Sequence, residues 1–445
     1  MIPRRMIALI VILAGGLALA GCSETNSGMS DEAANITDES VQQGQSDYEK
    51  ISAASSVHIY NVIEDGTFWA IVTDEIGQTS IVHTNVDRDI LGSMEKSAEE
   101  TMQGGISDTL FVVRQDNEYK IYDINSHEDI SDSYKSDYDT ITSYMETEDS
   151  AVFGVRKVYD SFEEQYVSFK LVDTTGKEFF EIPLDSKSLM NNYGIEKNYV
   201  TEDVNISYAG NNVYYIKYVA SQYRNDLNAL VVDLNRNKVI PAAFPRVNGS
   251  YLCTSDGNYT IAYTQQYSPI MVDHELGAEI EFPNSEYVPM QKISDGVFYA
   301  TGRYNGNASA QVFLNPLGEV GIDLNQYPQE AVSVYPFKDG AAFVRFRNNY
   351  VTFIDLKGEF LFEPIKGYLP EYIEDSGIAI MYDESYEEGG RKIVSIERNG
   401  NTSEINLVGD PEDFMLIEYE GEKYWVCDGE AGLQVQKYED IYTTH

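Results

Sequence analysis

A short turn recurs along most of the chain at a nearly constant interval, and this periodicity restricts the fold more than any other feature. Each copy begins with Asp, Asn or Glu and most copies close on Gly, residue types that form tight turns through positive φ or local backbone bonds. The copies are Asp173–Gly176, Asp233–Arg236, Asp273–Gly277, Asn315–Gly318, Asp355–Gly358 and Glu397–Gly400, with fainter ones at Asn85–Arg88 and Asp123–Ser126. From Asp233 onward they begin 40, 42, 40 and 42 residues apart.

A second turn series keeps phase with the first and divides each repeat into four strands. The clearest repeat, Val332–Pro364, alternates four runs of apolar and β-branched residues with turns, and no long run with helical period occurs. A repeat of about 40–45 residues with four strands is typical of a propeller blade, which buries its apolar faces by stacking on neighbours. The second series comprises Asp65-Gly66, Asn211-Asn212, Asp256-Gly257, Asp295-Gly296, Asp339-Gly340 and Ser376-Gly377.

These repeats predict an all-β fold, a β-propeller of four-stranded blades. Eight units carry both turns or traces of them, and a tail at Phe414–Tyr438 adds three strands. We expect the first unit, Val57–Leu91, to share a blade with this tail, which gives eight blades; seven is the other count considered. The 60-residue step from Asp173 to Asp233 leaves separate sandwich domains as an alternative.

Two single repeats resemble repeats of known families. Phe337–Pro364 is similar to the WG repeat of bacterial proteins, although Tyr350-Val351 stands where that pattern has Trp-Gly. Val172–Phe179 is similar to the repeats of quinoprotein-like propellers, which carry Trp in most blades, whereas this chain has two Trp. Each resemblance covers one unit and implies an architecture, not an activity.

The N-terminus has the layout of a secretory signal. Two arginines precede an apolar run, Met6–Ala20, which is shorter than the about 20 apolar residues of a membrane span. The run ends Leu19-Ala20-Gly21-Cys22, which resembles the bacterial lipobox. That resemblance implies cleavage before Cys22, lipid on its thiol, and anchoring of the mature chain to the extracytoplasmic face of a cell membrane.

The segment after Cys22 is rich in Ser, Asn, Gln, Asp and Glu and nearly lacks large apolar side chains. Such a composition cannot bury enough surface to offset its conformational entropy, so it predicts a disordered tether. We therefore divide the chain into a signal peptide at 1–21, an acidic tether at 22–50 and a propeller domain at 51–445.

Composition argues against some classes of partner and leaves open whether the cysteines form a disulfide. The net charge of −42 argues against nucleic acid and anionic lipid surfaces, because their phosphates would be repelled. Beyond Cys22, only Cys253 and Cys427 remain. Exported chains often form disulfides, but two cysteines define no framework, so whether they are bridged stays open.

The longest connections of the predicted ring open on one face, which we call the long-loop face. Long loops on a rigid scaffold tend to carry binding residues, and their mixture of Tyr, Asn and Arg suits contact with a protein or a glycan. Solvated polar loops without a ligand are the alternative. The candidate binding residues are Tyr134, Tyr138, Tyr159, Tyr193, Tyr223, Arg224, Tyr304, Asn305 and Tyr386.

Motifs for catalysis or metal binding do not stand out. The five histidines lack ligand spacing, and no Gly-x-Ser-x-Gly, phosphate-binding loop or His-Glu-x-x-His occurs. Asp132, Asp137 and Asp139 lack the glycine and terminal glutamate of a calcium loop. Glu64–Trp69 partly matches the Asp box of sialidase-like propellers, but we interpret it as a hairpin turn followed by core aromatics. We predict no cofactor and no metal site, and the catalytic residues, if any, are unknown.

Three functions are compatible with these features. The favoured one is a surface-tethered, non-catalytic binding or scaffold propeller for an extracellular protein or glycan. The second is an extracellular polysaccharide hydrolase, whose paired carboxylates cannot be picked out among 73 acidic residues. The third is an envelope-assembly lipoprotein, which would have a stable membrane partner.

Overall fold

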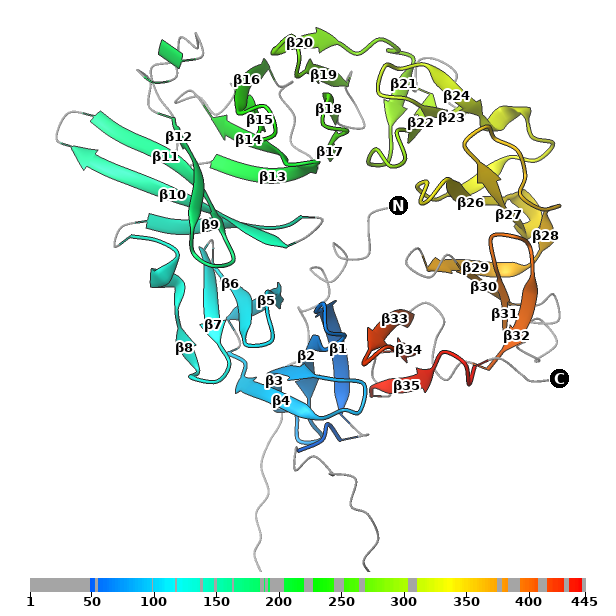
Figure 1. Cartoon of the computed structure of the whole chain (residues 1–445), viewed down its shortest axis with the longest axis horizontal. Coiled ribbons are helices and arrows are strands. Elements are labelled where there is room, and N and C mark those ends of the chain that lie inside the picture. The colour runs from blue at the N-terminus through cyan, green and yellow to red at the C-terminus, as the bar shows by residue number, and fades with distance from the viewer. Residues whose placement is uncertain are drawn as a thin grey trace, which may run out of the picture. The chain divides into compact units, whose positions relative to one another are not determined.

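Nine antiparallel sheets follow one another along the chain and stand radially around a common centre (Figure 1). They belong to one unit, Tyr48–His445. This computed structural model describes residues 49–441 apart from 53–54, 98, 117, 137–138, 148–149, 162–163, 185–187, 189–190, 193–203, 220–226, 244–251, 264–268, 303–309, 374–377, 383–392, 407–413 and 428–431. The predicted signal peptide and Cys22 lie outside the described residues, as does the predicted tether up to residue 48.

We number the sheets blades 1 to 9 in chain order; the first eight have four strands each and the ninth has three. Blades 1 to 3 comprise β1 (Ser56–Val62), β2 (Phe68–Thr73), β3 (Thr79–Thr84) and β4 (Ile90–Glu95); β5 (Glu100–Gly105), β6 (Leu110–Gln115), β7 (Glu118–Asp123) and β8 (Glu128–Asp129); and β9 (Asp139–Glu146), β10 (Ala151–Ser161), β11 (Glu164–Asp173) and β12 (Glu178–Pro183). Blades 4 to 6 comprise β13 (Val204–Gly210), β14 (Val213–Val219), β15 (Leu227–Asp233) and β16 (Lys238–Ala243); β17 (Leu252–Ser255), β18 (Tyr259–Tyr263), β19 (Ile270–Asp273) and β20 (Ala278–Glu281); and β21 (Tyr287–Pro289), β22 (Phe298–Gly302), β23 (Gln311–Leu314) and β24 (Val320–Asp323). Blades 7 to 9 comprise β25 (Ala331–Val334), β26 (Ala341–Phe346), β27 (Tyr350–Asp355) and β28 (Ile365–Lys366); β29 (Tyr368–Ile373), β30 (Ile378–Tyr382), β31 (Ile393–Ile396) and β32 (Thr402–Ile405); and β33 (Phe414–Tyr419), β34 (Glu422–Cys427) and β35 (Gln434–Lys437).

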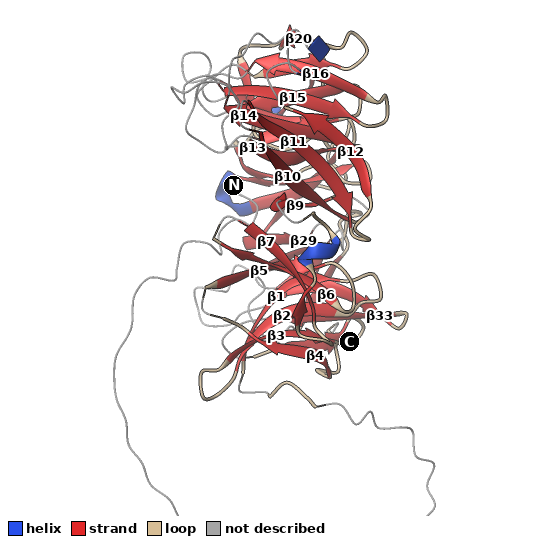
Figure 2. Cartoon of the chain, turned by 90° about the vertical axis from the view of Figure 1, so that its left-hand side faces the viewer, coloured by secondary structure: helices blue, strands red, loops and turns tan. Residues whose placement is uncertain are grey.

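Strands dominate the regular structure, as Figure 2 shows. The described part of the chain also holds three short 3-10 helices, η2 (Ser131–Ser133), η3 (Leu324–Gln326) and η4 (Arg347–Asn349). No helix among the described residues is long and apolar enough to cross a membrane.

Within the described residues, the turn series read from the sequence are the strand connections of the blades, whereas Ser376-Gly377 lies outside the described residues. In blade 7, Asp339-Gly340 joins β25 to β26, and Asp355–Gly358 joins β27 to β28. Gly340 and Gly358 have φ of 77° and 81°, which an L side chain rarely adopts. Asp355 Oδ1 accepts the backbone N–H groups of Lys357 and Glu359, both at 2.9 Å. The predicted four-stranded β-propeller architecture is thus confirmed, and its local cause is the turn chemistry.

The hydrophobic core is divided into layers between blades. Nine clusters of buried side chains occur in the described residues, and each draws on two neighbouring blades. Between blades 4 and 5, for example, Tyr215 and Val231 lie with Cys253 and Val272. Fully burying one such apolar side chain contributes about 1.5–3 kcal/mol. A blade therefore gains most of its stability from its neighbours, as expected of a repeat that cannot bury its own faces.

The ring closes between blade 9 and blade 1 through side chains, by apolar packing and by a hydrogen bond from Asn85 Nδ2 to Tyr419 Oη at 3.3 Å. Ile417 and Val426 of blade 9 share a cluster with Val57 and Phe68 of blade 1, and no strand is shared between the two sheets. The prediction that the first unit and the tail form one blade, and with it the count of eight or seven, is therefore wrong: the structure has nine blades. The tail folds as its own sheet, and its last strand, Gln434–Lys437, is polar enough to serve as an outer edge.

Trp69 anchors the contact between blades 1 and 2. Its indole N–H donates to Ser107 O at 2.8 Å, and its ring lies against Gly105, where a Cβ would approach Trp69 Cδ1 to 1.9 Å. The Asn61 amide bonds the backbone O and N of Gly105 at 2.8 and 2.7 Å. The interpretation of Glu64–Trp69 as a hairpin turn followed by core aromatics is confirmed, since Phe68 and Trp69 are fully buried after the β1–β2 turn.

The two cysteines of the ring are separate. Cys253 and Cys427 are both buried free thiols, and they lie in different clusters, between blades 4 and 5 and between blades 8 and 9. Burial raises the pKa of Cys253 to about 12, so this thiol is held in its unreactive protonated form. The open question of a bridge is answered in the negative for this structure.

Candidate functional site

Most of the predicted long-loop residues fall outside the described part of the chain. Tyr159 lies in β10 opposite Tyr166 of β11, close to the end of this hairpin. The structure therefore brings none of the nine candidates together within the described residues. Those outside them are Tyr138, Tyr193, Tyr223, Arg224, Tyr304, Asn305 and Tyr386.

Tyr134 lies in the contact between blades 2 and 3. Its ring is buried edge-on against Phe153 at 5.3 Å, and its hydroxyl donates to Thr174 O at 2.7 Å. Thr174 belongs to the short turn between β11 and β12, so Tyr134 reaches the short-turn side of the ring and not the long-loop face. Tyr327 makes the same kind of contact with Gly358 O in the β27–β28 turn, at 2.5 Å. Both tyrosines fasten one blade to a turn of the next.

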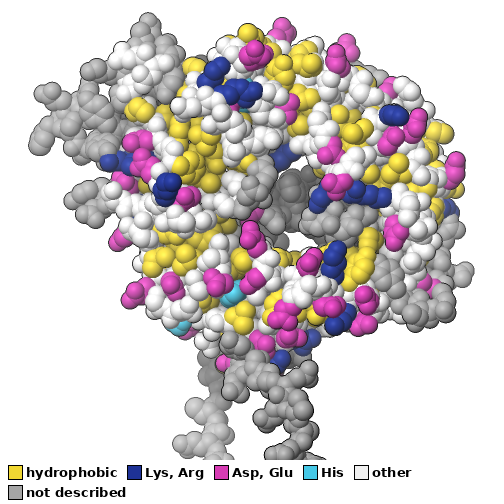
Figure 3. All heavy atoms as spheres, viewed as in Figure 1, with side chains coloured by type: hydrophobic (Ala, Val, Ile, Leu, Met, Phe, Trp, Pro, Cys, Tyr) yellow, Lys and Arg dark blue, Asp and Glu magenta, His cyan; other side chains and the backbone are white. Residues whose placement is uncertain are grey.

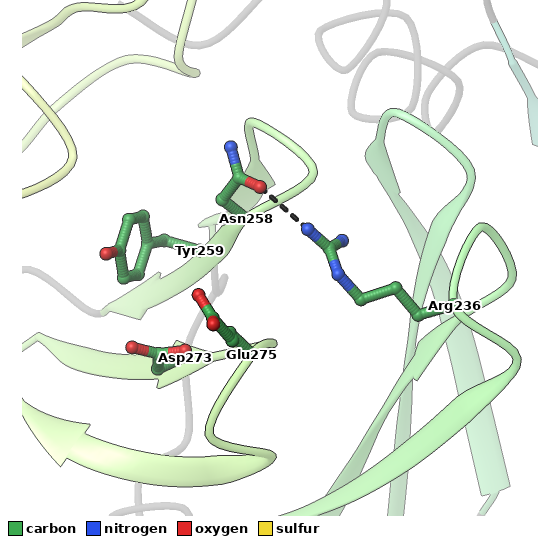
Figure 4. A pocket seen from close by; sticks show the side chains of 5 residues that line it. All are labelled: Arg236, Asn258, Tyr259, Asp273 and Glu275. Atoms are coloured by element: carbon green, nitrogen blue, oxygen red, sulfur yellow. Dashed lines mark hydrogen bonds between the residues drawn. The ribbon is translucent and has the colours of Figure 1, made fainter.

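A polar hollow of about 160 Å³ opens where blades 4 and 5 meet. We call it the blade 4–5 hollow; it is lined by Arg236, Asn258, Tyr259, Asp273 and Glu275. Arg236 reaches it from the β15–β16 turn, whereas the other four come from blade 5 (Figure 4). Acidic side chains are scattered over the face in Figure 3, while basic ones gather at few places.

Arg236 is fixed on its inner side by a buried carboxylate and by the neighbouring blade. Its Nη1 donates to Asp233 Oδ2 at 2.9 Å and to Gly257 O, and its Nη2 donates to Asn258 Oδ1 at 2.7 Å. These bonds use three of the five N–H donors of a guanidinium. The remaining two have no partner among the described residues, so a held cation with spare donors faces the hollow.

Asp233 joins the hollow to a chain of buried polar groups. His274 Nδ1 lies 2.7 Å from Asp233 Oδ2, and His274 Nε2 lies 2.8 Å from Thr260 Oγ1. Burial would raise the pKa of Asp233, but hydrogen bonds from His274 and Arg236 outweigh it and hold the pKa below 3.8. Asp233 is therefore an ionised acceptor that ties blade 4 to blade 5.

Thr260, His274 and Asp233 are the residue types of a nucleophile, a base and an orienting acid. Their burial excludes nucleophilic catalysis by these three residues. Thr260, His274 and Asp233 have relative exposures of 1%, 0% and 0%. A catalytic hydroxyl must contact a reacting atom of the substrate, and this one faces only its neighbours inside the protein. The network is structural: it clamps two blades and positions Arg236.

The other side of the hollow offers acceptors. Asp273 uses Oδ1 for the N–H of Leu276 at 2.9 Å, and the exposed Glu275 carboxylate has no partner among the described residues. Behind it, Lys238 Nζ donates to the carbonyls of His274 and Glu275 at 2.9 and 3.0 Å. The hollow is thus lined by both spare donors and spare acceptors where blades 4 and 5 meet. The described residues contain no group of three His, Cys, Asp or Glu side chains placed to hold a metal ion.

The sequence carried one signal for this site that remained unused. In the turn series, the copies Asn85–Arg88 and Asp233–Arg236 close on Arg where most copies close on Gly. Of these two arginines, Arg236 lines the hollow. Its meaning depends on Asp233 and His274 meeting across 41 residues of chain, which the turn pattern alone does not reveal.

A second buried histidine, His83 in β3, gives a pH-dependent prediction. His83 Nε2 lies 2.7 Å from Thr67 Oγ1, and its ring stacks on Trp69 at 5.0 Å. Burial lowers the pKa of His83 below 6.5, although the charges of Asp65 and Asp108 oppose this. The unfolded chain therefore binds the extra proton first, so stability is full above pH 6.5 and falls as the pH drops below it, by about 1.4 kcal/mol per pH unit at most.

The measurement is urea unfolding at pH 7.5 and 5.5 of the wild type and of His83→Gln. The variant should lose less stability on acidification, because the two proteins differ only at position 83. Equal losses would show that His83 does not carry the effect.

No family model matches the chain, and none of the curated proteins matches its sequence. Among solved structures it is similar to a eukaryotic initiation factor (9% identity over 81% of this chain and 90% of that chain, TM-score 0.48). It is also similar to BamB from Moraxella catarrhalis (11% identity, 80% and 98%, TM-score 0.33) and to the β-propeller domain of the Trilobed protease from Pyrococcus furiosus (12% identity, 80% and 99%, TM-score 0.34). Because these TM-scores are below 0.5, the likenesses carry no argument about this chain.

Proposed function

We propose that this protein is a lipid-tethered, non-catalytic binding propeller for an extracellular protein or glycan. Lipid on Cys22 would hold it on the extracytoplasmic face of a membrane, and the ring would present rigid binding surfaces. The support for the tether is the lipobox resemblance at Leu19–Cys22. The support for binding is the blade 4–5 hollow, where the Arg236 guanidinium is held in place before any ligand arrives.

The proposal that the propeller is non-catalytic rests on one observation, the burial of the hydrogen-bonded residues Thr260, His274 and Asp233. Hydrogen-bond donors held in place by neighbouring groups lower the entropic cost of binding a ligand, and Arg236 is held in this way. Because these three residues have no contact with solvent, they cannot present a nucleophile to a substrate. Such a site can recognise a ligand and leave its bonds unchanged.

A glycan-cleaving activity is the second candidate, and one observation favours it. Asp273 and Glu275 place two carboxylates in one hollow, which is the minimum set for glycoside hydrolysis. Release of reducing ends from polysaccharides, lost in Glu275→Gln, would establish this candidate in place of the first.

The tether is tested by fractionating cells that express the wild type or Cys22→Ser. The wild type should sediment with membranes and carry acyl mass on its N-terminal cysteine, because stable anchoring needs at least two acyl chains. The variant should leave the membrane fraction. A wild-type protein that is soluble and unmodified contradicts the tether.

Binding is tested with a glycan array and with cross-linking on intact cells. Tyr223→Ala and Tyr304→Ala alter the predicted long-loop face, and Glu275→Gln alters the hollow. A ligand whose capture survives all three substitutions does not use either surface. The failure of every glycan and of every specific cross-link would remove the binding function.

A further inference from the structure

Side chains of both charges surround the blade 4–5 hollow, and this restricts the chemistry of a ligand. Arg236 and the nearby Lys238 are accompanied by Asp273 and Glu275, while Asp233, which pairs with Arg236, is buried behind the hollow. A purely anionic ligand would meet both carboxylates and the field of a chain with net charge −42. A purely cationic ligand would meet the guanidinium. The hollow therefore favours a ligand that is neutral overall.

The hydroxyl groups of one ligand can pair with both kinds of polar group in the hollow. A hydroxyl donates one hydrogen bond and accepts two, so one hydroxyl can donate to the Glu275 carboxylate while another accepts from the spare N–H groups of Arg236. The Asn258 amide and the Tyr259 side chain, which line the same hollow, add an amide and an aromatic surface. Amide, carboxylate, guanidinium and phenol groups together can satisfy several hydroxyls of one sugar ring.

A zwitterionic ligand is also neutral, but its desolvation on entering the hollow costs more free energy. Its ammonium and carboxylate must both lose water, while an open hollow leaves the resulting ion pairs screened, and exposed ion pairs contribute little. Hydroxyls lose less hydration for the same number of bonds. The geometry accordingly favours a sugar over an amino acid.

We infer that the blade 4–5 hollow is a binding site for one neutral sugar residue of an extracellular glycan. The inference rests on the proposed binding function and deepens it by naming a ligand class and the residues that recognise it. Arg236 and Asn258 hold one side of the sugar, Asp273 and Glu275 accept from its hydroxyls, and Tyr259 bounds the hollow. A site of this size should bind a monosaccharide weakly, with a Kd of roughly a millimolar.

The test is saturation-transfer NMR on the full-length protein purified in detergent, with methyl glycosides of glucose, galactose, mannose and N-acetylglucosamine as probes. Glu275→Gln and Tyr259→Phe remove one charge and one hydroxyl without touching the Asp233 clamp. Glu128→Gln is the matched control, because Glu128 is likewise exposed near a third-to-fourth strand turn, in blade 2. Glycine serves as the zwitterionic probe.

At least one methyl glycoside should show transfer, and Glu275→Gln should weaken it about tenfold, the effect of losing one charge-assisted bond. Glu128→Gln should leave binding unchanged. A sugar that binds equally well to all three variants overturns the site while leaving the binding function in place. Transfer to glycine but to no sugar overturns the ligand class. If no probe binds but a protein is cross-linked through Tyr223 or Tyr304, the sugar site fails and the proposed function stands.

Discussion

Gly66→Ala should destabilise the protein by about 3 kcal/mol more than Gly77→Ala. Gly66 lies in the β1–β2 turn, and a Cβ there would stand 1.9 Å from the backbone O of Glu418 in blade 9. Backbone cannot rotate out of the way as a side chain can. The contact between blades 9 and 1 that closes the ring, which we call the seam, must therefore open or shift. Gly77 shares the positive φ, 85° against 82°, but has nothing within 4 Å of its Cβ.

The two substitutions thus share the cost of a left-handed alanine, about 1–2 kcal/mol, and differ only in the contact. Urea unfolding followed by tryptophan fluorescence is the measurement, because Trp69 and Trp425 lie in blades 1 and 9 on the two sides of the seam. Equal unfolding midpoints for the two variants would mean that the seam adjusts without loss, and that closure contributes little to stability.

Asp233→Ala should reduce the free energy of unfolding by about 3–5 kcal/mol, the usual cost of removing one partner of a buried charged pair. The substitution leaves His274 Nδ1 without its acceptor and deprives Arg236 of the carboxylate that holds it. Asp355→Ala is the control: Asp355 opens the corresponding turn of blade 7 and bonds backbone N–H groups there. It should cost only about 1 kcal/mol.

The Asp233 effect should also depend on pH with a definite sign. Because the folded chain holds the pKa of Asp233 below 3.8, the carboxylate stabilises the fold fully above that pH and progressively less below it. The difference in unfolding free energy between the wild type and Asp233→Ala should therefore shrink as the pH falls below 3.8. A difference that is constant down to pH 2 would contradict an ionised, clamped Asp233.

The blades could be predicted from sequence because their signals are local. A turn that needs positive φ, such as Asp339-Gly340, leaves its mark in residue type at the turn itself. The number of blades could not be predicted in this way. It depended on whether Phe414–Tyr438 pairs with the first unit or with itself, a choice made by contacts across more than 300 residues.

For the candidate site, too, local features could be predicted from the sequence and contacts between distant residues could not. Arg236 was visible as one of two arginines that close a copy of the turn series. The group that fixes its carboxylate partner Asp233, His274, belongs to the next repeat, and only the stacking of blades 4 and 5 brings His274 and Asp233 together. Tyr134 was assigned to the long-loop face because it follows β8, the short outer strand of blade 2. In the structure its ring lies instead in the contact with blade 3, where its hydroxyl donates a hydrogen bond to Thr174 O.

A ring closed by side-chain packing has a consequence for how such a chain could have grown. When the first and last sheets share a strand, adding a repeat by gene duplication breaks that strand pairing and must repair it. Here blade 1 and blade 9 are each complete in their own backbone bonds, so a duplicated or lost repeat would leave every sheet intact and ask only for a modest change in the angle between neighbours. Nine blades is then a number reached by repetition and maintained by side-chain contacts between neighbouring sheets, since no strand pairing joins the first sheet to the last.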